Sequence, residues 1–165
     1  MVGDAMTFNR DEPMASNQYQ AGSAALILDS HARLLQRDLL PRSVYPIEVA
    51  KGLYDAPFVV LAHDTAPDPV FFYANRQAQR LFEMTWAEMV ALPSRHSAEP
   101  LAREDRQRLL DRVSRQGYID DYTGVRISRT GKRFLIAKAA VWNLLDPAGH
   151  VIGQAAAFDH WTPIA

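Results

Sequence analysis

Residues 58–82 read FVVLAHDTAPDPVFFYANRQAQRLF, and this stretch decides the fold. Two apolar runs, Phe58–Ala62 and Val70–Ala74, flank a segment rich in proline and aspartate. This pattern predicts two antiparallel strands joined by a long turn. Asn75 follows the second strand, where an asparagine can cap a helix whose apolar positions recur at helical spacing. A strand pair that leads directly into a capped helix indicates a mixed α+β domain.

Short helices and a strand meander follow this stretch. Thr85 and Glu88 have the spacing of a capping box, and a longer helix is expected from Arg103 to Gly117. Three strands separated by short turns come next: Tyr118–Ser128, Arg133–Leu145 and Val151–Phe158. The sequence therefore predicts a five-stranded antiparallel sheet flanked by short helices.

A further helix is expected before the sheet. The segment Ser23–Leu40 carries a broad apolar stripe, and Pro41 ends it. An isolated helix of this length is marginally stable in water, so it should pack on a second copy of the chain or on the outer face of the sheet. Residues 1–20 are polar and without periodicity, which predicts a mobile tail. The predicted parts are therefore this tail, a flanking helix and connector over 21–46, and the α+β domain over 47–165.

Composition narrows the function. The chain has 165 residues, 18 basic and 19 acidic side chains, and a net charge of −1, which gives no argument for direct contact with nucleic acid or a membrane surface. Cysteine is absent, which excludes disulfides, thiolate metal sites and cysteine nucleophiles. No apolar run approaches the roughly 20 residues that span a bilayer, and acidic residues stand where a signal peptide would be basic. These features predict a cytoplasmic protein.

Three further strings carry a family resemblance. They occupy residues 92–100, 120–128 and 141–143, and read LPSRHSAEP, DDYTGVRIS and VWN. Together with the order of the elements, they resemble the MEKHLA domain family, a PAS-like branch found in bacteria and at the C-termini of plant homeodomain-zipper transcription factors. The resemblance covers about Ile47 to Trp161, although the family's eponymous six-residue string is absent. It implies a PAS-like fold and a sensory or protein-interaction module, not an enzyme, that signals through a homodimer or a partner protein.

The resemblance also bears on cofactors. Haem-binding PAS domains place a histidine on the long helix before the meander, and Arg103–Gly117 contains none. Flavin photosensors of this fold need a cysteine after the asparagine-capped turn, and the chain has none. Haem and covalent flavin are therefore disfavoured, and the cofactor is left unknown. No two histidines have the four-residue spacing of a helical zinc site, so no metal is predicted.

A small apolar ligand is expected between the sheet and the short helices. Aromatic walls with a few polar groups are typical of such sites. The candidate pocket residues are Phe72, Leu81, Trp86, His96, Trp142, Asn143 and Gln154. Asn75 is assigned a capping role, and no residue is assigned a catalytic one. Small side chains at Ala139 and Ala156 would leave room above the sheet, but the pocket residues could equally fill a close-packed core.

Strict alternation along Arg133–Leu145 makes a specific prediction about the faces of that strand. It places Ile136, Lys138 and Trp142 on one side and Asn143 on the other. Both sides are largely apolar, so each should be covered by helices or a partner. Asn143 and Gln154, if buried, must be hydrogen-bonded to a neighbour, a water or a ligand.

The competing class is a small α+β-cone enzyme of the ketosteroid-isomerase type. It would use His63 or His96 with Asp64 or Glu99 for acid–base chemistry. Such folds also wrap a curved sheet around a pocket, but they lead with long helices. The asparagine-capped turn and the short helices favour the PAS-like alternative.

Overall fold

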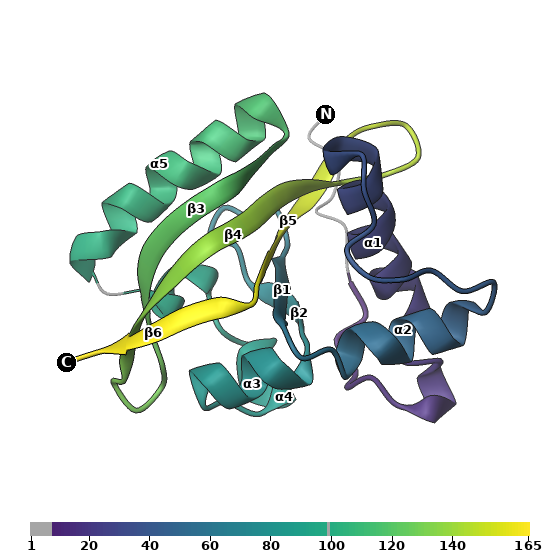
Figure 1. Ribbon diagram of the computed structural model, residues 1–165, viewed down its shortest axis with the longest axis horizontal. Helices are drawn as coiled ribbons and strands as arrows, with labels where there is room; N and C mark the ends of the chain where they lie inside the picture. The colour runs from purple at the N-terminus through teal and green to yellow at the C-terminus, as the bar shows by residue number, and fades with distance from the viewer. Residues whose placement is uncertain (1–7, 99) are drawn as a thin grey trace.

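A computed structural model describes residues 8–98 and 100–165, without the side chains of residues 100–103 and 106. Figure 1 shows the arrangement of the elements. The N-terminal elements are η1 (Ala15–Asn17), α1 (Ala21–Leu35) and α2 (Pro46–Tyr54). The next are β1 (Val59–His63), β2 (Phe71–Ala74), α3 (Arg76–Phe82), α4 (Trp86–Met89), η2 (Ser94–Ser97) and α5 (Pro100–Gln116). The last are β3 (Tyr118–Ile127), β4 (Arg133–Leu145), β5 (Val151–Phe158) and β6 (His160–Ile164).

The strands form one antiparallel sheet in the order β2-β1-β5-β4-β3, which confirms the predicted α+β fold with its five-stranded sheet. A sixth strand, β6, pairs with residues 133–137 of β4, on the same side as β5. The sequence analysis missed β6 because Pro163 lies within it and proline is depleted in strands. Pro163 pairs with Phe134 in the register of β4 and β6.

Helices lie on both sides of the sheet (Figure 1), and buried apolar side chains form a layer on each side. We call the face covered by α1 and α2 the outer face, and the face covered by α3 and α5 the inner face. Buried residues of the outer layer include Ile27, Leu53 and Trp142. The inner layer includes Phe82 and Leu109. Each large apolar side chain buried in these layers stabilises the fold by about 1.5–3 kcal/mol.

A bulge in β4 changes which residues face which layer. Lys138 has φ 54°, and the strand pairs with β6 up to Ala137 and with β5 from Ala140 onward. The extra residue resets the alternation, so Ile136 and Ala139 both lie in the inner layer while Trp142 lies in the outer layer. The prediction that Ile136 and Trp142 share one face is therefore wrong.

Helix α1 buries its apolar stripe against the outer face of its own sheet. Trp142 Nε1 donates to Ile27 O over 3.1 Å, and Leu145 N donates to Ser30 Oγ over 2.9 Å. This is the second of the two placements that the sequence left open. The helix ends at Leu35, not at Leu40, because Gln36 adopts the left-handed conformation with φ 59° and its N–H bonds back to Ala32 O.

Residues 8–20, part of the predicted tail, contact the domain through several side chains. The Phe8 ring stacks on Phe72 with centroids 3.7 Å apart. Trp86 Nε1 donates to Arg10 O over 2.8 Å, and the Arg10 guanidinium pairs with the Asp64 carboxylate at 2.7 Å. Nothing in the sequence indicated these contacts, because single anchoring side chains in a polar segment such as the predicted tail leave no periodic pattern. The remaining part of that tail, residues 1–7, lies outside the described residues.

Buried His31 gives the stability a pH dependence. Its ring is edge-on to Trp142, and its Nδ1 lies 3.0 Å from Arg37 O. Burial lowers the pKa of His31 below its ordinary value of 6.5. The unfolded chain therefore binds this proton more tightly, so we expect the contribution to be full above pH 6.5 and to fall as the pH drops through the folded-state pKa. Urea unfolding at about pH 7.5 and 5.5 measures the loss, and His31→Gln should reduce it; an equal loss in both proteins would contradict the expectation.

Candidate functional site

A cavity of about 60 Å³ lies between the inner face of the sheet and α5, and we call it the inner cavity. Most of its wall is apolar. The aromatic part of the wall is formed by Phe71, Phe82, Tyr122 and Phe158. The polar side chains at the wall are His63, Ser97, Arg126 and Gln154. An apolar wall with a few convergent polar groups is the usual composition of a small-molecule site.

Small residues on two neighbouring strands make room for the cavity. Ala139 of β4 and Ala156 of β5 both line it. The bulge at Lys138 turns the Ala139 methyl group toward the inner layer, where it forms part of the cavity wall. Without the bulge, regular alternation would place this methyl group on the outer face. The space therefore depends on the bulge as well as on the alanines.

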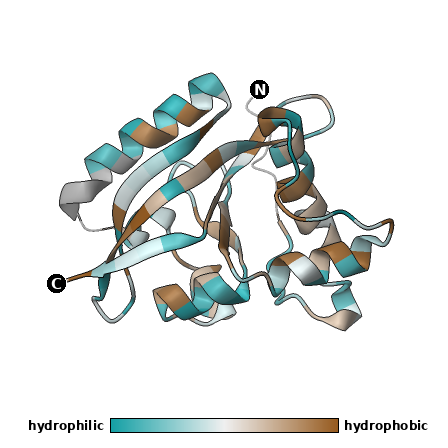
Figure 2. Ribbon diagram, viewed as in Figure 1, coloured by the Kyte–Doolittle hydropathy of each residue, from teal (hydrophilic) through white to brown (hydrophobic). Residues whose placement is uncertain are grey.

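Two buried amides connect the sheet to α5. Gln154 Nε2 lies 3.0 Å from Asn143 Oδ1 and 3.1 Å from Ser114 Oγ of α5. Asn143 Nδ2 donates to Val113 O over 3.1 Å. These bonds satisfy the polar groups that the sequence analysis singled out. Figure 2 shows that α5 is largely hydrophilic, and the amide network adds to the apolar contacts that Leu109 and Val113 make with the sheet.

A polar groove of about 420 Å³ adjoins the inner cavity. Both are lined by His63, Leu110 and Gln154, which therefore form the partition between them. The groove runs between the β1–β2 turn (residues 64–69), η2 and α5. Movement of Leu110 or Gln154 would open the cavity to the groove, which gives a ligand a path to the inner face.

The structure distributes the seven predicted pocket residues over both faces of the sheet. Phe72, Trp86 and Trp142 belong to the outer layer, where Phe8, Arg10 O and Ile27 O contact them in turn. Since the sheet lies between them and the inner cavity, they do not share one pocket with Gln154. The sequence analysis placed them together because it lacked the bulge and the N-terminal segment.

The remaining predicted residues divide as well. Leu81 is half-buried against the inner layer but is not part of the cavity wall. His96 is exposed, and its Nε2 lies 2.8 Å from Arg95 Nη1. Asn143 and Gln154 are both on the inner side, and Gln154 reaches the cavity. Asn75 caps α3 by accepting from Ala78 N over 3.1 Å, the role that the sequence assigned to it.

Sequence reasoning missed Tyr122 and Arg126 as wall residues. A signal was present, since an arginine between Val125 and Ile127 is unusual in a strand that is expected to be apolar. Period-two alternation places Arg126 on the same side as Tyr122. Their stacked geometry supports this, with the guanidinium carbon 5.2 Å from the ring centroid.

The Asp64 carboxylate, one of the two acids of the enzyme alternative, is engaged with groups other than the His63 imidazole. The Asp64 carboxylate accepts from Ala66 N and Val70 N and pairs with Arg10. His63 Nδ1 instead lies 2.8 Å from the main-chain oxygen of Asp64. The carboxylate therefore orients the turn and not the imidazole. Glu99, the other carboxylate of that alternative and a candidate partner for either His63 or His96, lies outside the described residues.

Flavin does not fit the inner cavity. Pockets for molecules of drug size measure about 300–1,000 Å³. The cavity has about 60 Å³, and bulky side chains such as Phe82 and Phe158 limit it. The absence of cysteine removes the covalent flavin adduct as well. Among the described residues there is no group of three or more His, Cys, Asp or Glu side chains placed to hold a metal ion. In the same part of the chain, no helix combines the length and apolar character that crossing a membrane requires.

Comparison with known proteins gives a family and a fold. The family model described as the MEKHLA domain matches residues 21–163. No curated protein sequence matches the chain. The crystal structure of a PAS domain from Colwellia psychrerythraea is similar, with a TM-score of 0.58 at 14% identity, over 71% of this chain and 94% of that one.

Two photoreceptor structures are also similar. The LOV domain of the blue-light photoreceptor Aureochrome1 has a TM-score of 0.52 at 16% identity, over 77% of this chain and 88% of that one. A variant of Vivid has a TM-score of 0.55 at 13% identity, over 80% and 97%. At these identities the likeness concerns the fold alone, which is PAS-like.

Proposed function

The chain belongs to the MEKHLA domain family, and we propose that it is a non-catalytic sensory module that binds a small, largely apolar molecule in the inner cavity. The observation that carries this proposal is the cavity itself, which lies between the sheet and α5 and is lined by aromatic rings, alanines and a few polar groups. Haem and covalent flavin are not part of the proposal, and the cytoplasmic location stays a prediction.

The amide network supports a route for the signal. Gln154 lines the cavity and also bonds to Ser114 of α5, while Asn143 bonds to Val113 of the same helix. A ligand that displaces the Gln154 amide would break its bond to α5, which would then be held mainly by the apolar contacts of Leu109 and Val113 and by the bond from Asn143 to Val113. A net hydrogen bond is worth about 0.5–1.5 kcal/mol, so the loss of one or two would shift the position of α5 measurably.

We propose that the module passes this change to a partner protein, the simplest partner being a second copy of the chain. The connector before α2 supports the proposal, since Val44, Tyr45 and Ile47 are exposed apolar residues close together in the sequence. The helical stripe that first suggested a dimer is buried within one chain. Sedimentation at micromolar concentration should show a dimer that Tyr45→Asp weakens. A monomer for the unsubstituted chain would contradict the homodimer.

Native mass spectrometry of the non-denatured protein tests the ligand proposal. We expect a small molecule to accompany the folded chain and to be released when the chain unfolds. Full occupancy in the wall variant Ala139→Leu would contradict a site in the inner cavity. The absence of a ligand, together with clear destabilisation by Ala139→Leu and Ala156→Leu, would leave only the protein-interaction role.

Enlarging a side chain at the inner cavity should cost little stability, whereas enlarging one in the outer layer should destabilise the fold. In Ala139→Leu the added methylenes enter existing space, so we expect the free energy of unfolding to stay within about 0.5 kcal/mol or to rise. Ala62→Leu is the matched control, because Ala62 is buried in the outer layer. This substitution should lower the free energy of unfolding by about 1–3 kcal/mol through overpacking. Urea unfolding measures both. Equal destabilisation by the two substitutions would contradict the presence of usable space.

A further inference from the structure

We propose that the ligand of the inner cavity is a small carboxylic acid bound as its carboxylate, with Arg126 as the residue that holds the carboxylate and the aromatic wall covering a short apolar tail. This inference rests on the proposed function, since it assigns the chemical class of the molecule that occupies the same cavity. Its basis is one buried cation at the wall of an otherwise apolar space.

Arg126 is buried and faces the cavity with most of its donors uncommitted. Only 9% of the surface of this residue is exposed to solvent. Its Nη1 donates to the main-chain oxygen of the preceding residue, Val125, over 2.9 Å. A guanidinium has five N–H donors, so four are left for other acceptors. None of the Arg126 nitrogens is both fully buried and without a partner, so the unbonded ones reach space that an acceptor can occupy.

The charges around the cavity are one-sided. Within the described part of the chain, no carboxylate lines the cavity or forms an ion pair with Arg126. The other polar wall groups, His63, Ser97 and Gln154, are uncharged or basic. A guanidinium without a carboxylate partner among the described residues favours an anionic occupant, and the planar fork of arginine matches the two oxygens of a carboxylate.

The position of Arg126 is held by its neighbours on β3. Its guanidinium carbon lies 5.2 Å from the centroid of the Tyr122 ring. The ring can lie there because residue 124 is glycine: a Cβ at Gly124 would come within 2.1 Å of the Tyr122 hydroxyl. The stack orients the arginine before any ligand arrives, which reduces the ordering cost of binding.

The volume sets the size of the acid. A water-sized group needs about 10–15 Å³ of cavity volume, so the inner cavity holds about four to six groups of this size. The volume of about 60 Å³ therefore suits acids from acetate to butyrate. Longer acids would have to displace Leu110 or Gln154 toward the polar groove.

Binding of sodium propionate to the full chain tests the inference. The methyl NMR signals of Ile136 and Val141 report on the cavity wall. Propionamide and propylamine are the probes of similar size without the negative charge. We expect propionate to shift these signals with an affinity at least tenfold higher than that of either control, because charge-assisted hydrogen bonds are about twice as strong as neutral ones.

Variants assign the effect to the arginine. Arg126→Gln should abolish the preference for propionate, whereas Arg129→Gln, at an exposed turn residue, should leave it unchanged. Arg126→Lys keeps the charge without the planar fork and should lower the affinity for propionate several-fold. It provides a second measurement if Arg126→Gln does not fold. Retention of the full preference in either Arg126 variant would overturn the inference.

Propionamide, the neutral probe, separates this inference from the proposed function. If propionamide binds at the cavity residues as tightly as propionate does, the cavity binds small molecules but the carboxylate assignment is wrong. If no probe shifts the cavity signals, both the assignment and the ligand-binding function are contradicted. A preference for propylamine would likewise overturn the assignment, because it would indicate an anionic site.

Discussion

Replacing Trp142 by alanine is expected to lower the free energy of unfolding by about 3–5 kcal/mol, a large part of the stability of a domain of this size. Trp142 is fully buried in the outer layer, its Nε1 donates to Ile27 O, and His31 packs edge-on against it at 4.8 Å. The substitution leaves a cavity, removes the bond to α1 and exposes the helix stripe. Urea unfolding monitored by circular dichroism measures the change.

Trp161→Ala is the control for this substitution. Trp161 lies in β6, is half-buried, and contacts Phe158 edge-on with centroids 6.0 Å apart. It is not attached to α1, so its loss should cost about 1 kcal/mol. Similar costs at the two tryptophans would contradict the assignment of Trp142 as the residue that fastens α1 to the sheet.

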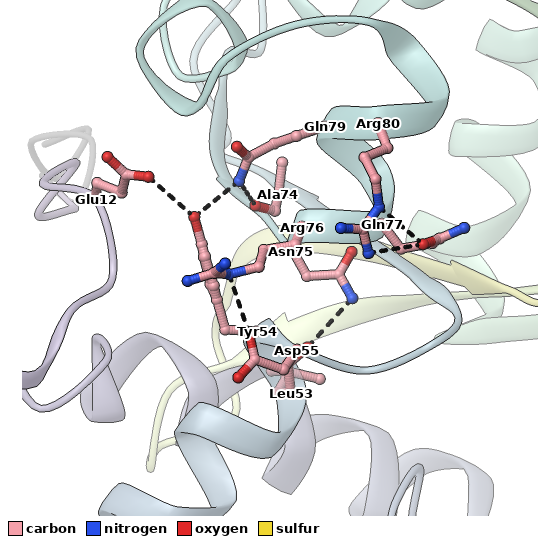
Figure 3. Close-up of polar contacts among 10 residues, drawn as sticks. All are labelled: Glu12, Leu53, Tyr54, Asp55, Ala74, Asn75, Arg76, Gln77, Gln79 and Arg80. Atoms are coloured by element: carbon pink, nitrogen blue, oxygen red, sulfur yellow. Dashed lines mark hydrogen bonds and ion pairs between the residues drawn. The ribbon is translucent and has the colours of Figure 1, made fainter.

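Replacing Asn75 by alanine is expected to cost about 3–4 kcal/mol, far more than an ordinary helix cap. Asn75 is fully buried. Its Oδ1 accepts from Ala78 N and Val60 N, each over 3.1 Å, and its Nδ2 donates to Leu53 O over 3.2 Å and Phe58 O over 2.8 Å. The side chain thus connects α2, β1 and α3, and Figure 3 shows the bond to Leu53. Alanine would leave these buried main-chain groups without their partner.

Thr85→Ala provides the matched control, because Thr85 caps α4 at an exposed position and accepts only from Glu88 N. Its replacement should cost about 1 kcal/mol. Thermal or urea unfolding of both variants gives the comparison. If Asn75→Ala cost no more than Thr85→Ala, the bonds of Asn75 to the neighbouring elements would contribute nothing to stability.

The network around Asn75 extends to the N-terminal segment. Figure 3 shows the Tyr54 hydroxyl between Glu12 and Gln79, with oxygen–oxygen and oxygen–nitrogen distances of 3.3 and 2.9 Å. Desolvation by burial raises the pKa of the Tyr54 hydroxyl, so it stays protonated and can donate to Glu12. Residues 8–20 are thereby connected to α2 and α3, the elements that lead into the sheet.

Local signals were sufficient to predict most of the fold. The strands β1 to β5 follow apolar runs bounded by turn residues, and Asn75 and Thr85 are caps that the chain reveals by residue type and spacing. These features depend on neighbours in sequence, so a single chain contains them. The family match and the similar structures agree with that prediction.

The site was predicted only in part, because it depends on contacts between distant residues. The left-handed Lys138 reverses the faces of β4, and nothing in the alternation of that strand marks the position. Phe8 and Arg10 cover Phe72 and Trp86 from a segment without periodicity. Gln154 was recognised because a polar residue in an apolar strand is conspicuous, and the same reasoning applied to Arg126 would have identified it.

Xenon binding followed by methyl NMR tests the central claim, a usable ligand cavity on the inner face, most directly. Xenon enters apolar cavities without needing a particular functional group. We expect saturable shifts at Leu109, Ile136 and Val141, which line the cavity, and none at Leu28 or Leu144 in the outer layer. Ala139→Leu should abolish the shifts. Absence of any shift at the cavity residues, or shifts of the same size in the outer layer, would contradict the account.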